Sequence, residues 1–209
     1  MTPPEDEVVV ERFDRAERWL HWSSAMLFLI LLGTGMVLYV GTLSAVVGRR
    51  VLVKDVHVIT GLLLPAPLMV AYGGSWRAQL RRDVRRFARW SVDDRRWLLS
   101  LGRRGRERMG KFNAGQKLNA IFVAGCIPVM LMTGAIMRWF SPFPLAWRTG
   151  ATFVHDSLAL VLLAVTVGHI LKALTTPRAI SAMRTGAVPA DHVRRHHPRW
   201  WRELQSGDR

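Results

Sequence analysis

Charged side chains are missing from long parts of this chain. Residues 19–48, 56–76 and 118–137 contain no Asp, Glu, Lys or Arg, and residues 149–171 contain only Asp156. Each stretch has the roughly 20 apolar residues that are needed to cross about 30 Å of hydrocarbon. The pattern predicts an all-α membrane protein with one membrane domain over residues 1–209, a four-helix bundle with spans at about 19–40, 56–72, 118–139 and 151–174.

Cysteine is almost absent, and the chain has no internal repeat. Cys126 is the single cysteine, so an internal disulfide is excluded. No CxxCH motif is present that could bind haem covalently. The lack of repeats and of broken helices also argues against a proton or metal-ion transporter.

Basic residues outnumber acidic residues by 30 to 15, yet they lie mainly between the predicted spans. The loop at 77–111 holds 13 Lys and Arg against four acidic residues, and residues 172–209 hold eight against three. Because cytoplasmic segments carry the excess of Lys and Arg, we expect this loop, the tail at 175–209 and both termini on the cytoplasmic side of a bacterial inner membrane. Nucleic acid is not an expected partner.

Two segments outside the spans have patterns of their own. The acidic start, PPEDEVVVERFDRAER, is not a cleavable basic leader, so the first span is expected to act as an uncleaved insertion signal. The loop segment WRAQLRRDVRRFARW has apolar residues at near-helical spacing. It fits either an interfacial helix on anionic lipid or a solvated basic loop.

Four histidines fall inside or at the edge of spans, where ionisable side chains mark functional sites. The predicted orientation places His57 and His155 near the outer surface and His21 and His169 near the cytoplasm. The fourth span supplies one member of each pair, and its two histidines are separated by a helix rise of roughly 21 Å.

Facing imidazoles from different helices suit six-coordinate haem iron. We therefore predict two stacked b haems, an outer one held by His57 and His155 and an inner one held by His21 and His169. A histidine in a span can instead serve only in helix–helix hydrogen bonding. Structural zinc would need four ligands around one point, and these residues lie at two levels. Asp156 could support His155 or face water, and water is favoured.

The four-histidine layout, KFNAGQK at 111–117 and RRHHPRWWRELQ at 194–205 resemble the gamma subunit of membrane-bound respiratory formate dehydrogenase, a dihaem cytochrome b. The resemblance covers roughly Phe13 to Leu204. Related cytochrome b subunits of nickel–iron hydrogenase or thiosulfate reductase share the histidines, so NAGQK and HHPRW are the more specific marks.

The resemblance implies that another subunit oxidises formate. Electrons would come from a catalytic alpha subunit with molybdenum or tungsten through an iron–sulfur beta subunit, and would cross from the outer to the inner haem. This chain would reduce menaquinone or ubiquinone near the cytoplasm and contribute to the proton motive force. A higher oligomer of the complex is possible, and the alternative donor is a hydrogenase or another periplasmic oxidoreductase.

The motif NAGQK also implies the quinone site. Asn113 and Gln116 can donate to a quinone carbonyl, and Gly115 lets the ring approach the backbone. From chemistry alone, Asn113 could equally cap the third span with Gln116 in its first turn. Lys117 stays unassigned. The adjacent His196 and His197 fit a basic, aromatic interfacial segment better than a metal site or a proton relay.

Overall fold

The computed structural model describes residues 8–104 and 108–206, which are mainly helical. Residues 3–7 of the acidic start lie outside the described residues. The elements in chain order are β1 (Val9–Glu11), α1 (Arg15–Tyr39), α2 (Gly41–Val47), α3 (Arg50–Leu63), α4 (Ala66–Gly73), α5 (Arg77–Ala88), α6 (Val92–Leu99), α7 (Ala114–Arg138), α8 (Leu145–Leu174), α9 (Pro177–Thr185), β2 (Ala187–Pro189), α10 (Ala190–His196) and α11 (Pro198–Gln205).

The chain divides into two compact units. The first unit comprises Met1–Arg18, Ser75–Ile121 and Lys172–Arg209, and the second comprises Trp19–Gly74 and Phe122–Leu171. The basic loop and the tail, which the charge pattern assigns to one side of the membrane, both belong to the first unit. Nearly all of the apolar sequence belongs to the second.

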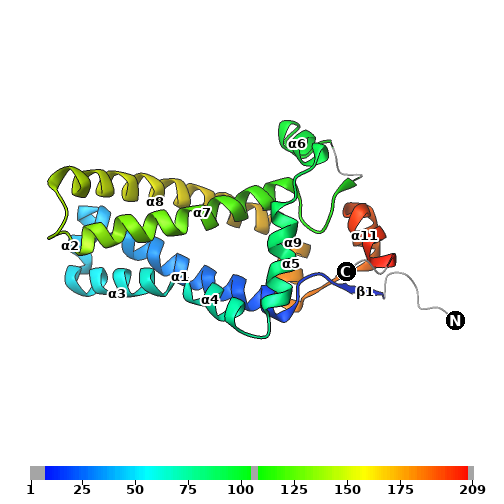
Figure 1. The fold of residues 1–209 in the computed structure, drawn as a ribbon, viewed down its shortest axis with the longest axis horizontal. Helices are drawn as coiled ribbons and strands as arrows, with labels where there is room; N and C mark the ends of the chain where they lie inside the picture. Colours follow the sequence, from blue (N-terminus) through cyan, green and yellow to red (C-terminus); the bar gives the residue numbers. More distant parts are fainter. Residues whose placement is uncertain (1–7, 105–107, 207–209) are drawn as a thin grey trace. The chain divides into compact units, whose positions relative to one another are not determined.

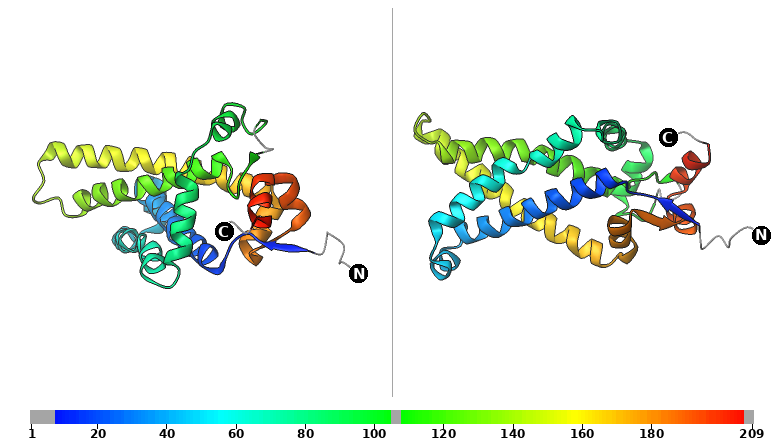
Figure 2. Two further views of the ribbon diagram at one scale, coloured as in Figure 1. Left: turned by 45° about the vertical axis from the view of Figure 1, so that its right-hand side comes forward. Right: turned by 90° about the horizontal axis from the view of Figure 1, so that it is seen from below.

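Four helical segments are long and apolar enough to cross a membrane, as the sequence predicted: Arg15–Tyr39, Arg50–Gly73, Ala114–Arg138 and Leu145–Leu174. They run side by side in alternating directions (Figures 1 and 2). The second segment consists of α3 and α4, which meet at Leu64 and Pro65. A proline interrupts a helix there because it lacks the backbone N–H and clashes with the preceding turn. The predicted four-helix bundle is confirmed.

Helix α1 begins before its apolar stretch does, because polar side chains cap it. In α1, the Asp14 carboxylate accepts a hydrogen bond from the Glu17 backbone N–H at 2.8 Å, and the Glu17 carboxylate accepts one from the Asp14 N–H at 2.9 Å. This reciprocal pair satisfies two amide groups that the helix itself cannot. For α1, composition therefore indicates where the span becomes apolar, whereas the cap determines where the helix begins.

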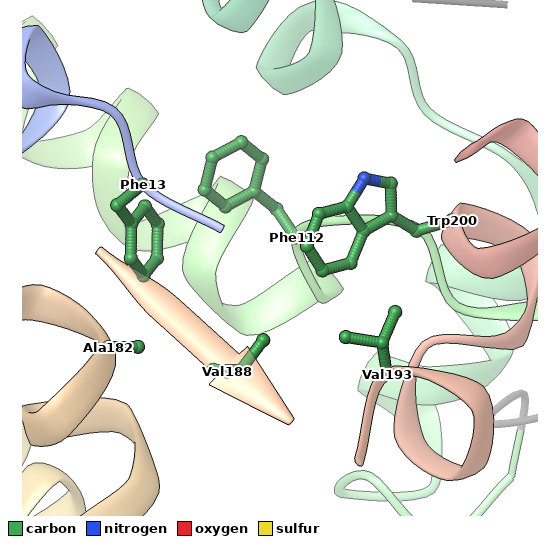
Figure 3. Packing of buried hydrophobic residues seen from close by; sticks show 6 residues of the cluster. All are labelled: Phe13, Phe112, Ala182, Val188, Val193 and Trp200. Carbon is green, nitrogen blue, oxygen red and sulfur yellow. The ribbon is translucent and has the colours of Figure 1, made fainter. Parts of the chain in front are cut away.

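The first unit has a small hydrophobic core of its own (Figure 3). It consists of Phe13, Phe112, Ala182, Val188, Val193 and Trp200. A short antiparallel ribbon of β1 and β2, in which Val10 is opposite Val188, joins the start of the chain to the tail. The sequence predicted a tail that lies at the membrane interface. In the structure its Trp200 is only 3% exposed, so the tail also supplies part of this core.

A buried ionic cluster ties three segments of the first unit together. The Lys111 Nζ lies 2.5 Å from a carboxylate oxygen of Glu17 and 3.5 Å from one of Asp83. The three side chains are 8–15% exposed. Asp83 lies on α5, so the basic segment that the sequence left open between a helix and a solvated loop is helical and is held by this contact. Removing one partner of a buried ion pair costs several kcal/mol, because the remaining charge stays desolvated.

We therefore expect Lys111→Met to destabilise the first unit by about 3 kcal/mol, because it leaves two buried carboxylates without a cation. The measurement is thermal unfolding of the detergent-solubilised chain, together with protease cleavage of the loop and tail. Lys172→Met, at an exposed lysine of the same unit, is the matched control. Equal melting temperatures for the two variants would contradict the stabilising role of the cluster.

His197 couples the stability of the first unit to pH. Its Nδ1–H donates to the Gly110 carbonyl at 2.7 Å, and the residue is 5% exposed. Burial lowers the pKa of His197 to about 4, and nearby Arg12, His192 and His196 oppose protonation further, whereas the Gly110 hydrogen bond favours it. The unfolded chain, with a histidine pKa of about 6.5, binds the proton more readily.

Stability of the first unit should therefore fall as the pH drops from about 6.5 to about 4, by on the order of 3 kcal/mol. Above this window the imidazole is neutral in both states, and its contribution is constant. His197→Asn retains a donor for Gly110 but does not titrate, so it should flatten the pH dependence of the melting temperature. His196→Asn, at an exposed position, should leave that dependence in place.

Candidate functional site

The structure brings the four span histidines together in two pairs, both within the second unit. The ring centroids of His57 and His155 are 6.3 Å apart, and those of His21 and His169 are 6.2 Å apart. His57 lies on α3 and His21 on α1, whereas α8 carries His155 and His169. These are the two pairs that the predicted membrane orientation combined.

The pairs differ in their surroundings. His21, His57 and His155 are half-buried, and His169 is exposed on the surface of α8. The ring of His21 also contacts the Trp22 indole edge-on, with centroids 5.2 Å apart. All four rings nevertheless face another histidine ring, which an orientation towards lipid alone would not produce.

The spacing of each pair fits an iron atom between two imidazoles. A metal–imidazole bond is about 2 Å long and a ring nitrogen lies about 1.2 Å from the ring centre, so two rings on one iron have centroids about 6.4 Å apart when aligned. The observed 6.2 Å and 6.3 Å agree with this value. Among the described residues, no group of three or more His, Cys, Asp and Glu could hold a metal ion. A porphyrin supplies four nitrogens itself, so two protein ligands suffice.

His57 and His155 each contact a Thr-Gly pair on a neighbouring span. The Thr34 Oγ1 lies 2.8 Å from the His57 Nδ1, and the Thr133 Oγ1 lies 3.0 Å from the His155 Nδ1. The glycines Gly35 and Gly134 follow directly. A Cβ atom at either glycine would lie 3.4 Å from the Cε1 of the adjacent imidazole, at the limit of van der Waals contact.

The threonines fix the roles of the two ring nitrogens. The Thr34 hydroxyl donates to the Ile30 carbonyl at 2.7 Å, and the Thr133 hydroxyl donates to the Val129 carbonyl at 2.8 Å. Since each hydroxyl proton is used in this way, the oxygen accepts from the imidazole Nδ1–H. The Nε2 atom then carries the lone pair and is the atom available to a metal.

Sequence reasoning missed these four residues and considered Asp156 instead. Asp156 is half-buried, and no hydrogen bond joins its carboxylate to His155 among the described residues. The dipeptide Thr-Gly occurs at 34–35 and 133–134, but also at 60–61, 149–150 and 185–186, so the sequence alone did not single out these partners.

The residues predicted to bind quinone lie at the start of α7, in the first unit. The Asn113 Oδ1 accepts a hydrogen bond from the Gln116 backbone N–H at 2.8 Å, and the Gln116 Oε1 accepts one from the Asn113 N–H at 3.0 Å. The capping role that the sequence left open is therefore present. Because the cap uses only the amide oxygens, the NH₂ groups of both side chains are left as donors.

Helix α6 packs against this turn through two contacts. A Cβ atom at Gly115 would lie 3.0 Å from the Trp97 ring, so only glycine fits there without a shift of the indole. The Lys117 Nζ, unassigned from sequence, lies 2.9 Å from an Asp94 carboxylate oxygen and 2.9 Å from the Arg89 carbonyl. Burial alone would raise the pKa of Asp94, but hydrogen bonds from Lys117 and Ser91 outweigh it and hold the pKa below its usual range.

Curated relatives cover nearly the whole chain. It is 27% identical over 208 residues to the cytochrome b556(fdo) subunit of formate dehydrogenase from Escherichia coli K12, covering 94% of this chain and 93% of that protein. It is 25% identical to the cytochrome b556(Fdn) subunit of the nitrate-inducible formate dehydrogenase from the same strain, covering 92% and 90%. A formate dehydrogenase cytochrome b556 subunit of Haemophilus influenzae is also 25% identical, covering 88% and 78%.

These relatives confirm the resemblance that the histidine layout and the two motifs indicated. The model of the prokaryotic cytochrome b561 family matches residues 12–186, which include all four spans. Membership implies that b-type haem is bound, and the geometry of the histidine pairs fits that group. The chain is an integral membrane protein that belongs to the prokaryotic cytochrome b561 family.

Proposed function

We propose that this chain is the dihaem cytochrome b subunit of a formate-oxidising respiratory complex, and that it transfers electrons across the inner membrane to quinone. His57 and His155 would hold the outer haem, and His21 and His169 the inner haem. The observation that carries the proposal is the presence of two histidine pairs with centroid distances of 6.3 Å and 6.2 Å in one four-span bundle. The curated relatives, which are formate dehydrogenase subunits, support this choice of complex.

A haem iron with two imidazole ligands supplies one-electron transfer and has no open coordination position. The protein residues therefore bind and orient, and they do not activate a substrate at the metal. Formate oxidation releases two electrons, one proton and carbon dioxide, and is assigned to a partner subunit with molybdenum or tungsten. An iron–sulfur subunit would connect that site to His57 and His155.

Quinone reduction consumes the same two electrons and takes up two protons. Asn113, Gly115 and Gln116 are the proposed quinone contacts, on the cytoplasmic side of the membrane. Protons taken up there and released by formate oxidation on the other side would contribute to the proton motive force. Support comes from the charge pattern: residues 77–111 hold 13 Lys and Arg and residues 172–209 hold eight, as is typical of cytoplasmic segments.

The cap at the start of α7 is compatible with the quinone proposal. With both amide oxygens accepting backbone hydrogen bonds, the side-chain NH₂ groups of Asn113 and Gln116 are the donors that remain for a quinone carbonyl. The contact of Trp97 with Gly115 gives the same turn an aromatic neighbour. Membrane lipid and the two other subunits complete the proposed set of partners.

The haem ligands are tested by His169→Ala and His155→Ala in the purified complex. Each should halve the pyridine haemochrome signal from two b haems per chain to one, because a single lost imidazole opens one site. His169→Ala should also abolish quinone reduction. His196→Ala, in the exposed part of the tail, should retain both haems. A colourless wild-type preparation from haem-replete cells would overturn the proposal, and reduction by hydrogen rather than formate would favour the hydrogenase alternative.

The quinone contacts are tested by Asn113→Asp and Gln116→Glu. Each retains the oxygen that caps α7 but removes the NH₂ donor, so quinone affinity should fall about tenfold, the loss of one hydrogen bond of about 1.4 kcal/mol. The measurement is a titration with a quinol-analogue inhibitor that follows the inner haem spectrum. Asn119→Asp, within the same helix, controls for added charge. Unchanged affinity in both variants would restrict Asn113 and Gln116 to capping.

A further inference from the structure

We propose that Thr34–Gly35 and Thr133–Gly134 are two matched seats that orient the outer haem ligands and lower the reduction potential of that haem. The inference rests on the proposed ligation by His57 and His155. In each seat the threonine hydroxyl accepts the Nδ1–H of the imidazole, at 2.8 Å and 3.0 Å. The two seats are alike in sequence, in hydrogen bonding and in the contact made by the glycine.

Each seat is rigid because its threonine is bound twice. The Thr34 hydroxyl is fixed by the Ile30 carbonyl one turn earlier in α1, and the Thr133 hydroxyl by the Val129 carbonyl in α7. Thr133 is 4% exposed, and Thr34 is half-buried, so water competes little for these bonds. A hydroxyl fixed in this way presents its oxygen to the imidazole in one direction and so defines the rotation of the ring.

The glycines complete the seats by leaving space beside the rings. The position of a Cβ atom at Gly35 or Gly134 would lie 3.4 Å from the imidazole Cε1. A methyl group there would touch the ring, and a larger side chain directed towards the ring would displace it from the threonine. The small residue therefore allows the neighbouring helix backbone to approach the ligand closely.

The expected electronic effect follows from the direction of the hydrogen bond. An imidazole that donates its second N–H becomes a more basic ligand through the other nitrogen. A more basic ligand stabilises ferric iron over ferrous iron, and hydrogen bonds of this kind are one of the means by which proteins set haem potentials. Two such bonds would lower the potential of the outer haem and favour onward transfer to the inner haem.

The test replaces Thr34 and Thr133 by valine, singly and together, in the purified complex. Valine has the shape of threonine without the hydroxyl. Each single change should raise the ferrous-to-ferric ratio of the outer haem at fixed potential about threefold, and the double change about tenfold, which is about 59 mV for one electron. The readouts are the midpoint potentials from an optical redox titration and the low-spin ferric EPR spectrum, which reports the relative orientation of the two ligand rings.

Thr166→Val is the matched control. The Thr166 hydroxyl donates to the Leu162 carbonyl at 2.7 Å, as the seat threonines donate to theirs, but within the described residues it has no hydrogen bond to a histidine. This variant should leave both potentials and the EPR spectrum unchanged. Thr34→Ser and Thr133→Ser keep a hydroxyl and should restore most of the wild-type potential.

The possible outcomes separate this inference from the proposed function. Retention of two haems with a raised outer potential, rescued by serine, supports the seats. Retention of two haems with an unchanged potential and EPR spectrum overturns them while leaving the dihaem assignment intact. Equal shifts at both haems, or valine and serine variants that behave alike, also overturn them. If the double valine variant fails to accumulate, the single variants and their serine counterparts decide.

Discussion

An imidazole in a membrane span must find a partner for each ring nitrogen, and the second unit of this protein is arranged around that requirement. Hydrocarbon offers no hydrogen bonds, so an unpaired polar nitrogen costs several kcal/mol. His57 and His155 meet the requirement on one side with the hydroxyls of Thr34 and Thr133, 2.8 Å and 3.0 Å away. On the other side the centroids of the two rings are 6.3 Å apart, a spacing that would fit a haem iron held by both imidazoles.

In the first unit, buried charged side chains are stabilised by opposite charges. Lys111, Glu17 and Asp83 are buried together, so each desolvated charge has an opposite charge beside it. His197 is buried as a neutral group that donates to the Gly110 carbonyl. Both arrangements join segments that are distant along the chain, since Lys111 and Glu17 are separated by 94 positions. The polar loop and tail are thereby held in a defined structure with an aromatic core.

How well each feature could be predicted depends on how far apart along the sequence the interacting residues lie. The spans were predictable because the exclusion of charge over about 20 residues is a local property of the sequence. The pairing of the histidines was predictable because, once the direction of each span is assigned, the depth of a residue in the membrane follows from its position along the span. The sequence left the role of Asn113 and Gln116 open between capping and quinone binding. The cap is present, and it was foreseeable because it involves only four consecutive residues. The partners of Lys117 and His197 were not predictable, because Asp94 and Gly110 are brought to them by the folding of separate segments.

The sequence alone determined that the chain crosses the membrane four times, that its basic segments group apart from its apolar ones, and that its four span histidines fall at two levels. These properties follow from composition and helix periodicity, which need no knowledge of contacts. Only the tertiary structure decided that Thr34 and Thr133, rather than Asp156, contact the rings of His57 and His155, and that Trp200 and His197 are buried. Those choices depend on the packing and rotation of neighbouring helices, which side-chain contacts set across more than 20 positions of sequence.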